Sequence, residues 1–141
     1  MAETSPTPLT RKLGIKPESR VALLAAPAGF GALLDPLPGG VSLCTALDGT
    51  EPFDVAVAFT LLRAEVAETV RSARPLMAPA SGLWIAWPKR SSGVSTEVSD
   101  DLVREIALPT GLVDNKVCAI DATWTGLRLV IRRELRSPRT V

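Results

Sequence analysis

Short apolar runs bounded by turn residues recur along the chain. A run of this kind is typical of a strand that is covered on both faces, as in a parallel sheet. The last two runs are connected through the loop 123–126, which is short enough for an antiparallel hairpin. The pattern predicts strands over residues 20–25, 41–46, 53–59, 83–87, 112–120 and 127–132.

Two segments between these runs have the spacing of amphipathic helices. Apolar residues recur every three or four positions from Leu62 to Ala73, with charged residues between them. From Val98 to Ile106 they recur every four positions, and Ser99 is the best candidate for the N-cap of that helix. We therefore expect two regular helices, each of which follows one of the central strands.

The order of the predicted elements is strand, short helix, strand, strand, helix, strand, helix, strand, strand. The early strands are linked by crossovers of the length that parallel pairing requires. This order predicts an α/β fold with three layers, in which a mostly parallel sheet of five or six strands ends in a C-terminal antiparallel hairpin. We expect a single domain over residues 9–135, with flexible tails at 1–8 and 136–141.

The composition is that of an ordinary globular protein, with 46% hydrophobic and 22% charged residues. A formal net charge of +1 argues against an overall basic surface for nucleic acid or an anionic membrane, so any anion recognition must be local. The sequence has no apolar run approaching the length of a membrane span, and its first residues lack the pattern of a secretory signal. A cytoplasmic location is expected.

The absence of histidine limits the available chemistry. Without it there is no Ser-His-Asp triad, no Cys-His pair and no histidine-bearing metal site. The two cysteines, Cys44 and Cys118, fall inside predicted strands and form no metal-binding framework. The sequence indicates no catalytic constellation and no metal site, which favours a protein that is not an enzyme.

Four segments are considered together: residues 16–21 before the first strand, Phe53-Asp54 and Gly82–Ile85 at the openings of later strands, and the closing hairpin. Together they resemble a class I methyltransferase domain that has lost about one strand–helix unit. The resemblance implies the strand order 2-1-3-4-6-5. That order would place Cys44 and Cys118 near opposite edges of the sheet, too far apart for a disulfide.

Three other segments resemble the recurring blocks of a bacterial family of unknown function. They are Leu13–Pro17, Trp87–Gly93 and Lys116–Leu127, and the likeness spans about residues 9–133. This second resemblance implies no activity.

The loop after the first strand is one candidate site. S-adenosylmethionine binding in the methyltransferase family uses a glycine-rich turn here and an acidic residue at the end of the second strand, much as dinucleotide sites do. Gly29 and Gly31 could form the turn, and Asp48 lies 19 residues after Gly29. Pro27 occupies the turn, however, and no acidic residue ends the first strand. An ordinary strand-to-helix turn is the competing interpretation.

The loop after the fourth strand is the other candidate. A turn at residues 80–82 is expected to lead into this strand. Ligands of open α/β sheets bind outside the carboxyl ends of the strands, and this loop leaves such an end. Its charges, hydroxyls and glycine could hold a phosphate or carboxylate, and two tryptophans could stack on a ring. A solvated loop and core tryptophans are the alternatives. The candidate ligand-binding residues are Trp87, Lys89, Arg90, Ser91, Ser92, Gly93 and Trp124.

Three functional hypotheses follow. The first is a non-catalytic binding or regulatory domain without a cofactor, whose small anionic ligand or protein partner engages the carboxyl ends of strands one, three and four. The second is a small enzyme that binds S-adenosylmethionine or a nucleotide through an atypical first loop. The third is a protein-interaction module that pairs through the exposed edge of the second strand. Nucleic acid and membrane are not expected partners.

Overall fold

A six-stranded mixed sheet forms the centre of the molecule. The computed structural model describes residues 8–47 and 50–136. The strand order is β2-β1-β3-β4-β6-β5, and β6 alone runs against its neighbours. The strands are β1 (Arg20–Leu24), β2 (Ser42–Cys44), β3 (Phe53–Phe59), β4 (Met77–Pro88), β5 (Leu112–Ala119) and β6 (Trp124–Ile131).

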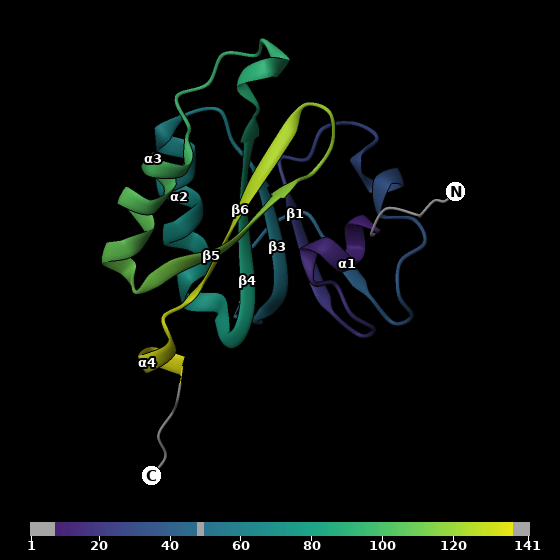
Figure 1. Ribbon diagram of the computed structural model, residues 1–141. Helices are drawn as coiled ribbons and strands as arrows, with labels where there is room; N and C mark the ends of the chain where they lie inside the picture. The colour runs from purple at the N-terminus through teal and green to yellow at the C-terminus, as the bar shows by residue number, and fades with distance from the viewer. Residues whose placement is uncertain (1–7, 48–49, 137–141) are drawn as a thin grey trace.

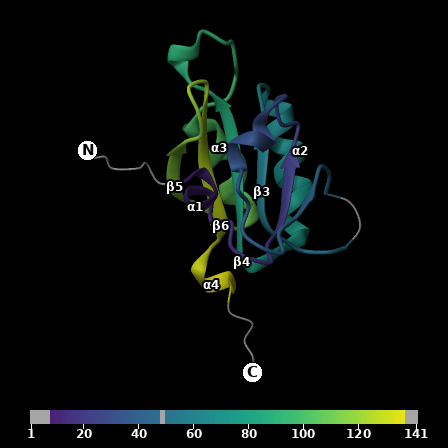
Figure 2. The same ribbon diagram turned by 90° about the vertical axis from the view of Figure 1, so that its right-hand side faces the viewer.

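Helices cover both faces of this sheet. Figure 1 shows α2 and α3 together on one side and the much shorter α1 on the other, and Figure 2 gives the same arrangement from the side. The helices are α1 (Leu9–Leu13), α2 (Arg63–Ala73), α3 (Asp100–Ala107) and α4 (Arg133–Arg136), with 3-10 turns η1 (Phe30–Leu34), η2 (Arg74–Leu76), η3 (Arg90–Ser92) and η4 (Leu108–Thr110).

The predicted α/β class and strand order are confirmed. The two cysteines lie at opposite edges of the sheet, Cys44 on β2 and Cys118 on β5, and both thiols are free. Ser99 caps α3, because its Oγ accepts a hydrogen bond from the Leu102 N–H at 3.2 Å. The predicted tails and the candidate Asp48 fall largely outside the described residues, since 1–7, 48–49 and 137–141 are not among them.

The predicted turn at residues 80–82 is wrong. These residues belong to β4, which begins at Met77. Phe53 of β3 pairs with Met77 and Val55 pairs with Gly82, so β4 has more residues than β3 between these two pairs. The extra residues form a bulge that the buried Ser81 closes: its hydroxyl donates to the Phe53 carbonyl and accepts from the Ala78 N–H. A bulge and a turn use the same small residues, so the sequence pattern does not separate them.

The predicted loop at residues 123–126 is also misplaced, because β6 already begins at Trp124. The chain reverses slightly earlier, where the Asp121 carboxylate accepts hydrogen bonds from the N–H groups of Thr123 and Trp124, each at 2.8 Å. An aspartate that binds the backbone two residues further on is a common way to form a turn. Trp124 is therefore a half-buried strand residue.

The two faces of the sheet contain separate hydrophobic cores. The core beneath α2 and α3 is almost entirely aliphatic. The core beneath α1 and η1 contains Phe30, Phe59 and Trp84, and Phe59 makes edge-to-face contacts with Phe30 and Trp124 at centroid distances of 4.8 and 5.0 Å. Trp84 is completely buried, and its indole N–H donates to the Leu13 carbonyl at 3.0 Å. This hydrogen bond fixes the end of α1 to the sheet.

Candidate functional site

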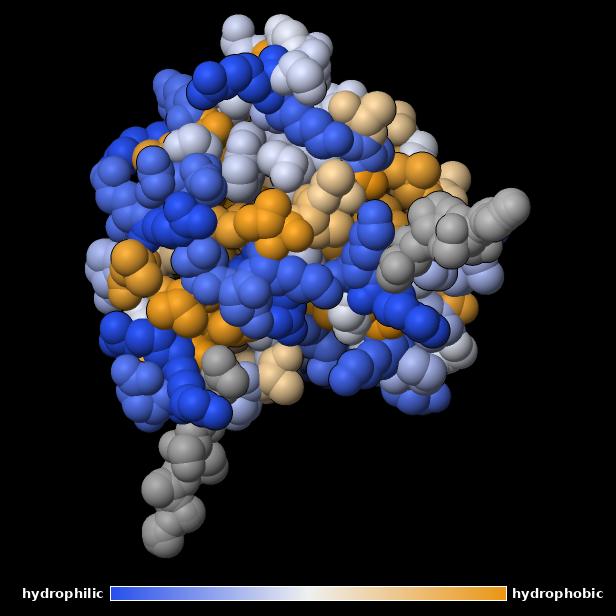
Figure 3. Space-filling view, in the orientation of Figure 1, coloured by the Kyte–Doolittle hydropathy of each residue, from blue (hydrophilic) through white to orange (hydrophobic). Residues whose placement is uncertain are grey.

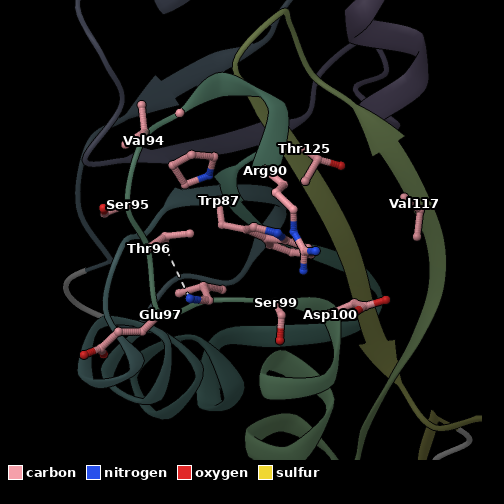
Figure 4. Close-up of a pocket in the computed structure, with 13 residues that line it drawn as sticks. Trp87, Arg90, Val94, Ser95, Thr96, Glu97, Ser99, Asp100, Val117 and Thr125 are labelled. Atoms are coloured by element: carbon pink, nitrogen blue, oxygen red, sulfur yellow. Dashed lines mark hydrogen bonds between the residues drawn. The ribbon is translucent and has the colours of Figure 1, made fainter.

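A cavity of about 730 Å³ lies at the carboxyl end of β4, between the segment that follows this strand and the start of α3. Figure 4 shows the side chains around it, with the Trp87 ring near the middle and the Arg90 guanidinium beside it. A cavity of this size is in the range of small-molecule sites. Its lining consists of Trp87, Pro88, Arg90, Gly93, Val94, Ser95, Thr96, Glu97, Val98, Ser99, Asp100, Val117 and Thr125.

The wall of the cavity formed by residues 94–99 is held in place from the other side, by the loop before α2. The Leu61 carbonyl accepts hydrogen bonds from the Glu97 N–H and the Thr96 hydroxyl, both at 2.8 Å. The Glu97 carboxylate in turn accepts from the Arg63 N–H at 2.8 Å. The opposite side is formed by the sheet itself, where Trp87 of β4 pairs with Thr125 of β6. The cavity is thus built between anchored segments.

Unpartnered polar groups face this space. Within residues 8–47 and 50–136, no side chain forms an ion pair with Arg90, and no group accepts a hydrogen bond from the Trp87 indole N–H. Two carboxylates line the cavity. The Asp100 carboxylate lies 3.5 Å from the Arg104 guanidinium, and Figure 4 shows the Glu97 carboxylate directed away from the Trp87 ring. A ligand here would meet a flat indole face, one guanidinium and several hydroxyls.

The sequence-predicted ligand residues divide into two groups. Trp87, Arg90 and Gly93 line the cavity, whereas Lys89, Ser91 and Ser92 are not among its lining residues. The Ser92 hydroxyl is occupied locally, because it donates to the Lys89 carbonyl at 2.7 Å and accepts from the Val94 N–H. Trp124 packs edge-to-face against Phe59 in the other core.

A smaller pocket of about 310 Å³ lies where the strand order reverses, between the carboxyl ends of β1 and β3. Leu24, Ala25, Thr60 and Glu65 contribute to its lining, and Ala25 has a left-handed conformation with φ of 56°. A non-glycine residue in that region costs roughly 1–3 kcal/mol, and such residues cluster at functional sites. The polar groups are already engaged: the Thr60 hydroxyl donates to the Ala86 carbonyl, and Glu65 accepts from the N–H groups before α2.

The glycines of the first loop follow directly after this end of β1. Gly29 adopts a φ of 85° and starts the 3-10 turn η1, and Gly31 lies within that turn. Both are exposed, and a side chain at either would meet no other atom within 4 Å. The loop is therefore open to a ligand, but the described residues at the end of β1 supply no carboxylate.

Sequence reasoning missed much of the cavity. Thr96, Ser99, Asp100, Val117 and Thr125 come from three separate segments that only the folded sheet brings together. Ser99 was expected at the start of α3, but as its N-cap. No local motif joins these positions, so the linear sequence carries no signal for the site.

Metal-ligand clusters and membrane-spanning helices are both missing from the described residues. No group of three or more cysteine, aspartate and glutamate side chains there is placed to hold a metal ion. In the same part of the chain, no helix has both the length and the apolar character that a membrane span requires.

Burial raises the pKa of the Cys118 thiol above its ordinary value, although Lys12 and Lys116 partly oppose this shift. A thiol with a raised pKa is a poor nucleophile at neutral pH.

Comparison with known proteins supports the fold. No family model and no curated protein sequence matches the chain. A SAM-dependent methyltransferase from Aquifex aeolicus superimposes with a TM-score of 0.66 and 13% identity, over 87% of each chain. Aeropyrum pernix fibrillarin, whose structure contains natively bound S-adenosyl-L-methionine, superimposes with a TM-score of 0.59 and 18% identity, over 84% of this chain and 69% of fibrillarin.

Thermus thermophilus TrmN gives a TM-score of 0.60 and 12% identity over 87% of this chain, which spans only 47% of TrmN. At such identities the likeness shows the fold alone. The resemblance to a reduced class I methyltransferase domain is thereby confirmed as a resemblance of fold, whereas the resemblance to a bacterial family of unknown function stays a prediction. The chain is an α/β domain with the fold of S-adenosylmethionine-dependent methyltransferases.

Proposed function

We propose that the chain binds S-adenosylmethionine, or a ligand with the same nucleoside and charged parts, at the carboxyl ends of β1 and β3. One observation carries the proposal: the pocket between β1 and β3 lies at the point where the strand order reverses. Open α/β sheets bind their ligands outside such a point. The open glycine turn after β1 and the likeness to proteins described as SAM-dependent favour this ligand over others.

The same residues favour binding without catalysis. Ala25 and Ala26 follow β1, so the end of this strand supplies no carboxylate, and the chain has no histidine. Glu65 and Thr60 are committed to backbone hydrogen bonds. We therefore propose that the domain binds the ligand as a sensor or partner-recruiting module, and that it does not transfer the methyl group.

Isothermal calorimetry with S-adenosylmethionine and its demethylated product tests the site. Gly31→Leu places a side chain in the open space of the first loop without a left-handed backbone, so it should weaken binding at least tenfold. Gly39→Leu is the matched control, because Gly39 has equally open surroundings but precedes the amino end of β2, whereas the proposed site lies at the carboxyl ends of β1 and β3. No heat of binding at millimolar ligand, or equal losses in both variants, would refute the proposal.

The cavity beside Trp87 supports a second candidate, a site for a flat ligand that carries an anion. The indole face favours a ring, and the Trp87 indole N–H and Arg90, neither of which has a partner among the described residues, favour a phosphate or carboxylate attached to it. Adenosine monophosphate is a suitable probe, with adenosine and inorganic phosphate as its separate parts. We expect the intact nucleotide to bind more tightly than either part.

Two neighbouring cations give this second candidate its control. Arg90→Ala should weaken adenosine monophosphate binding roughly tenfold, because a hydrogen bond to a charged group is lost. Lys89→Ala should leave it nearly unchanged, since Lys89 is not part of the lining. Equal effects of the two changes would instead favour a diffuse basic loop, and no binding of the nucleotide would exclude this candidate.

A further inference from the structure

The outer edge of β5 carries an unbalanced positive charge. A groove of about 530 Å³ separates this strand from α1, and its lining includes Arg11, Lys12 and Lys116. None of the three has an ion-pair partner among residues 8–47 and 50–136, and the groove lining contains no carboxylate. Among the described residues, the Lys116 ammonium donates to the Lys12 carbonyl alone, at 3.4 Å. Figure 3 shows hydrophilic side chains gathered on this face of the molecule.

The backbone of β5 is free along the same edge. This strand is last in the sheet, and in the described chain it pairs with β6 alone. Alternate residues of an antiparallel strand turn their N–H and C=O groups away from the partner strand, so half of these groups between Lys116 and Ala119 face outward. An edge of this kind is a template for another extended segment.

The side chains of β5 divide between its two faces. Lys116 and Cys118 lie on the α1 face, where Arg11 and Lys12 complete the positive groove. The Val117 side chain alternates to the other face, with 63% of its surface exposed, and this residue contributes both to the rim of the groove and to the cavity beside Trp87. An added strand would therefore meet cations on one face and apolar surface on the other.

We propose that β5 accepts an extended acidic segment of a partner protein by strand addition, with acidic residues toward α1 alternating with apolar residues toward Val117. Charge selects this occupant. A second copy of the chain would bring two such positive clusters together, and like charges on facing strands destabilise the pair. Single-stranded nucleic acid would offer negative charge, but the groove lining contains no aromatic ring on which a base could stack.

Fluorescence anisotropy with a labelled six-residue peptide of alternating glutamate and valine tests the proposal on the full chain. Two control peptides separate its parts: one replaces each glutamate by lysine, and the other is N-methylated at alternate residues so that it keeps its charges but loses backbone donors. We expect saturable binding of the first peptide and at least tenfold weaker binding of both controls. Equal binding of the N-methylated peptide would overturn strand addition.

Charge reversal locates the site. Lys12→Glu and Lys116→Glu should each raise the dissociation constant roughly threefold to tenfold, because an exposed attraction becomes a repulsion. Lys16→Glu is the matched control, since Lys16 is exposed and outside the groove. Unfolding midpoints confirm that each variant is folded. Unchanged affinity in both groove variants, or equal losses in all three, would overturn the proposal.

Hydrogen exchange identifies the occupant. Outward amides of β5 should exchange rapidly in the free chain and become protected only with the acidic peptide bound. Protection already present in the free chain at low concentration would assign the edge to another part of the same chain, and protection that grows with concentration would assign it to a second copy. Protection by a ten-residue oligouridylate equal to that by the peptide would assign it to nucleic acid. Each of these three results overturns the proposal.

Discussion

The two faces of the sheet are covered by very different amounts of regular structure. On one face, α2 and α3 provide 11 and 8 residues of helix over an aliphatic core. On the other, α1 has five residues and η1 is a single 3-10 segment, and both lie on an aromatic core. A helix of five residues is not stable by itself in water, since nucleation costs more than so few hydrogen bonds return.

We call the face covered by α1 and η1 the thin face, and the face covered by α2 and α3 the thick face. The thin face depends on a few large side chains. Leu13 and Trp84 are completely buried, and the hydrogen bond between them joins α1 to the centre of β4. The thick face instead distributes its contacts over two amphipathic helices. Damage to one residue should therefore act locally on the thin face and globally on the thick one.

The largest expected effect is on the thin face. Trp84→Ala should lower the free energy of unfolding by about 3–5 kcal/mol, because it leaves a cavity and removes the hydrogen bond to Leu13. Hydrogen exchange should in addition show α1 opening in conditions where the rest of the chain stays folded. Trp84→Phe, which keeps a ring but loses the N–H, should cost less, about 1–3 kcal/mol. Wild-type protection of α1 in Trp84→Ala would contradict the comparison.

A matched change on the neighbouring residue addresses the thick face. Leu83 is equally buried but packs beneath the helices α2 and α3, and Leu83→Ala should cost about 2–5 kcal/mol. The loss should appear as a single cooperative transition in urea, without selective exchange in α1. Selective opening of α1 in this variant would mean that the two cores are not separate.

The helix cap gives a smaller effect on the thick face. Ser99→Ala should lower the free energy of unfolding by about 1 kcal/mol, because the Leu102 N–H loses its acceptor. Ser95→Ala is the control: Ser95 is exposed, and a surface change of this kind usually stays within about 0.5 kcal/mol. Thermal unfolding of the two variants would detect the difference, and equal midpoints would argue against the cap.

The smallest expected effect is a pH dependence of the stabilisation that Glu68 gives to the folded state through α2. Hydrogen bonds from Arg71 and then Ser72 lower the pKa of Glu68 below its ordinary value of 4.5. A carboxyl group with a lowered pKa in the folded state stabilises that state above the ordinary pKa, and the stabilisation is lost as the pH falls through the lowered pKa. The stability difference between wild type and Glu68→Gln should therefore shrink in acid. Urea titrations across that pH range would measure it, and a constant difference would contradict the assignment.

The order of elements along the chain could be predicted because it depends on the spacing of apolar runs, whereas the order of strands within the sheet came from the resemblance to class I methyltransferase domains. β3 begins at Phe53 and ends at Phe59, as its pattern predicts, and Gly14 ends α1 in the left-handed conformation that favours glycine. What the pattern could not supply was the pairing partner of each residue. Ser81 and Trp124 lie in strands because hydrogen bonds to Phe53 and Asp121 set the register there.

The helical face of α3 shows the same limit. The predicted apolar series was Val98, Leu102 and Ile106. Val98 is buried, but Leu102 and Ile106 are only half-buried. The completely buried positions of α3 are Val103 and Ala107. Periodicity gives the existence of a helix, while its rotation depends on neighbouring elements. The candidate cavity depends on that rotation too, since Ser99 and Asp100 reach it from the start of α3.

The positions of Trp84 and Trp87 on one strand give the chain two internal optical probes. The protein has three tryptophans and no tyrosine, so its ultraviolet emission comes from indole alone. Trp84 is completely buried, whereas Trp87 lies in the wall of the cavity, three residues away along β4. In the variant Trp124→Phe, emission colour and accessibility to a quencher would separate the state of the fold from the state of the cavity, without any added label.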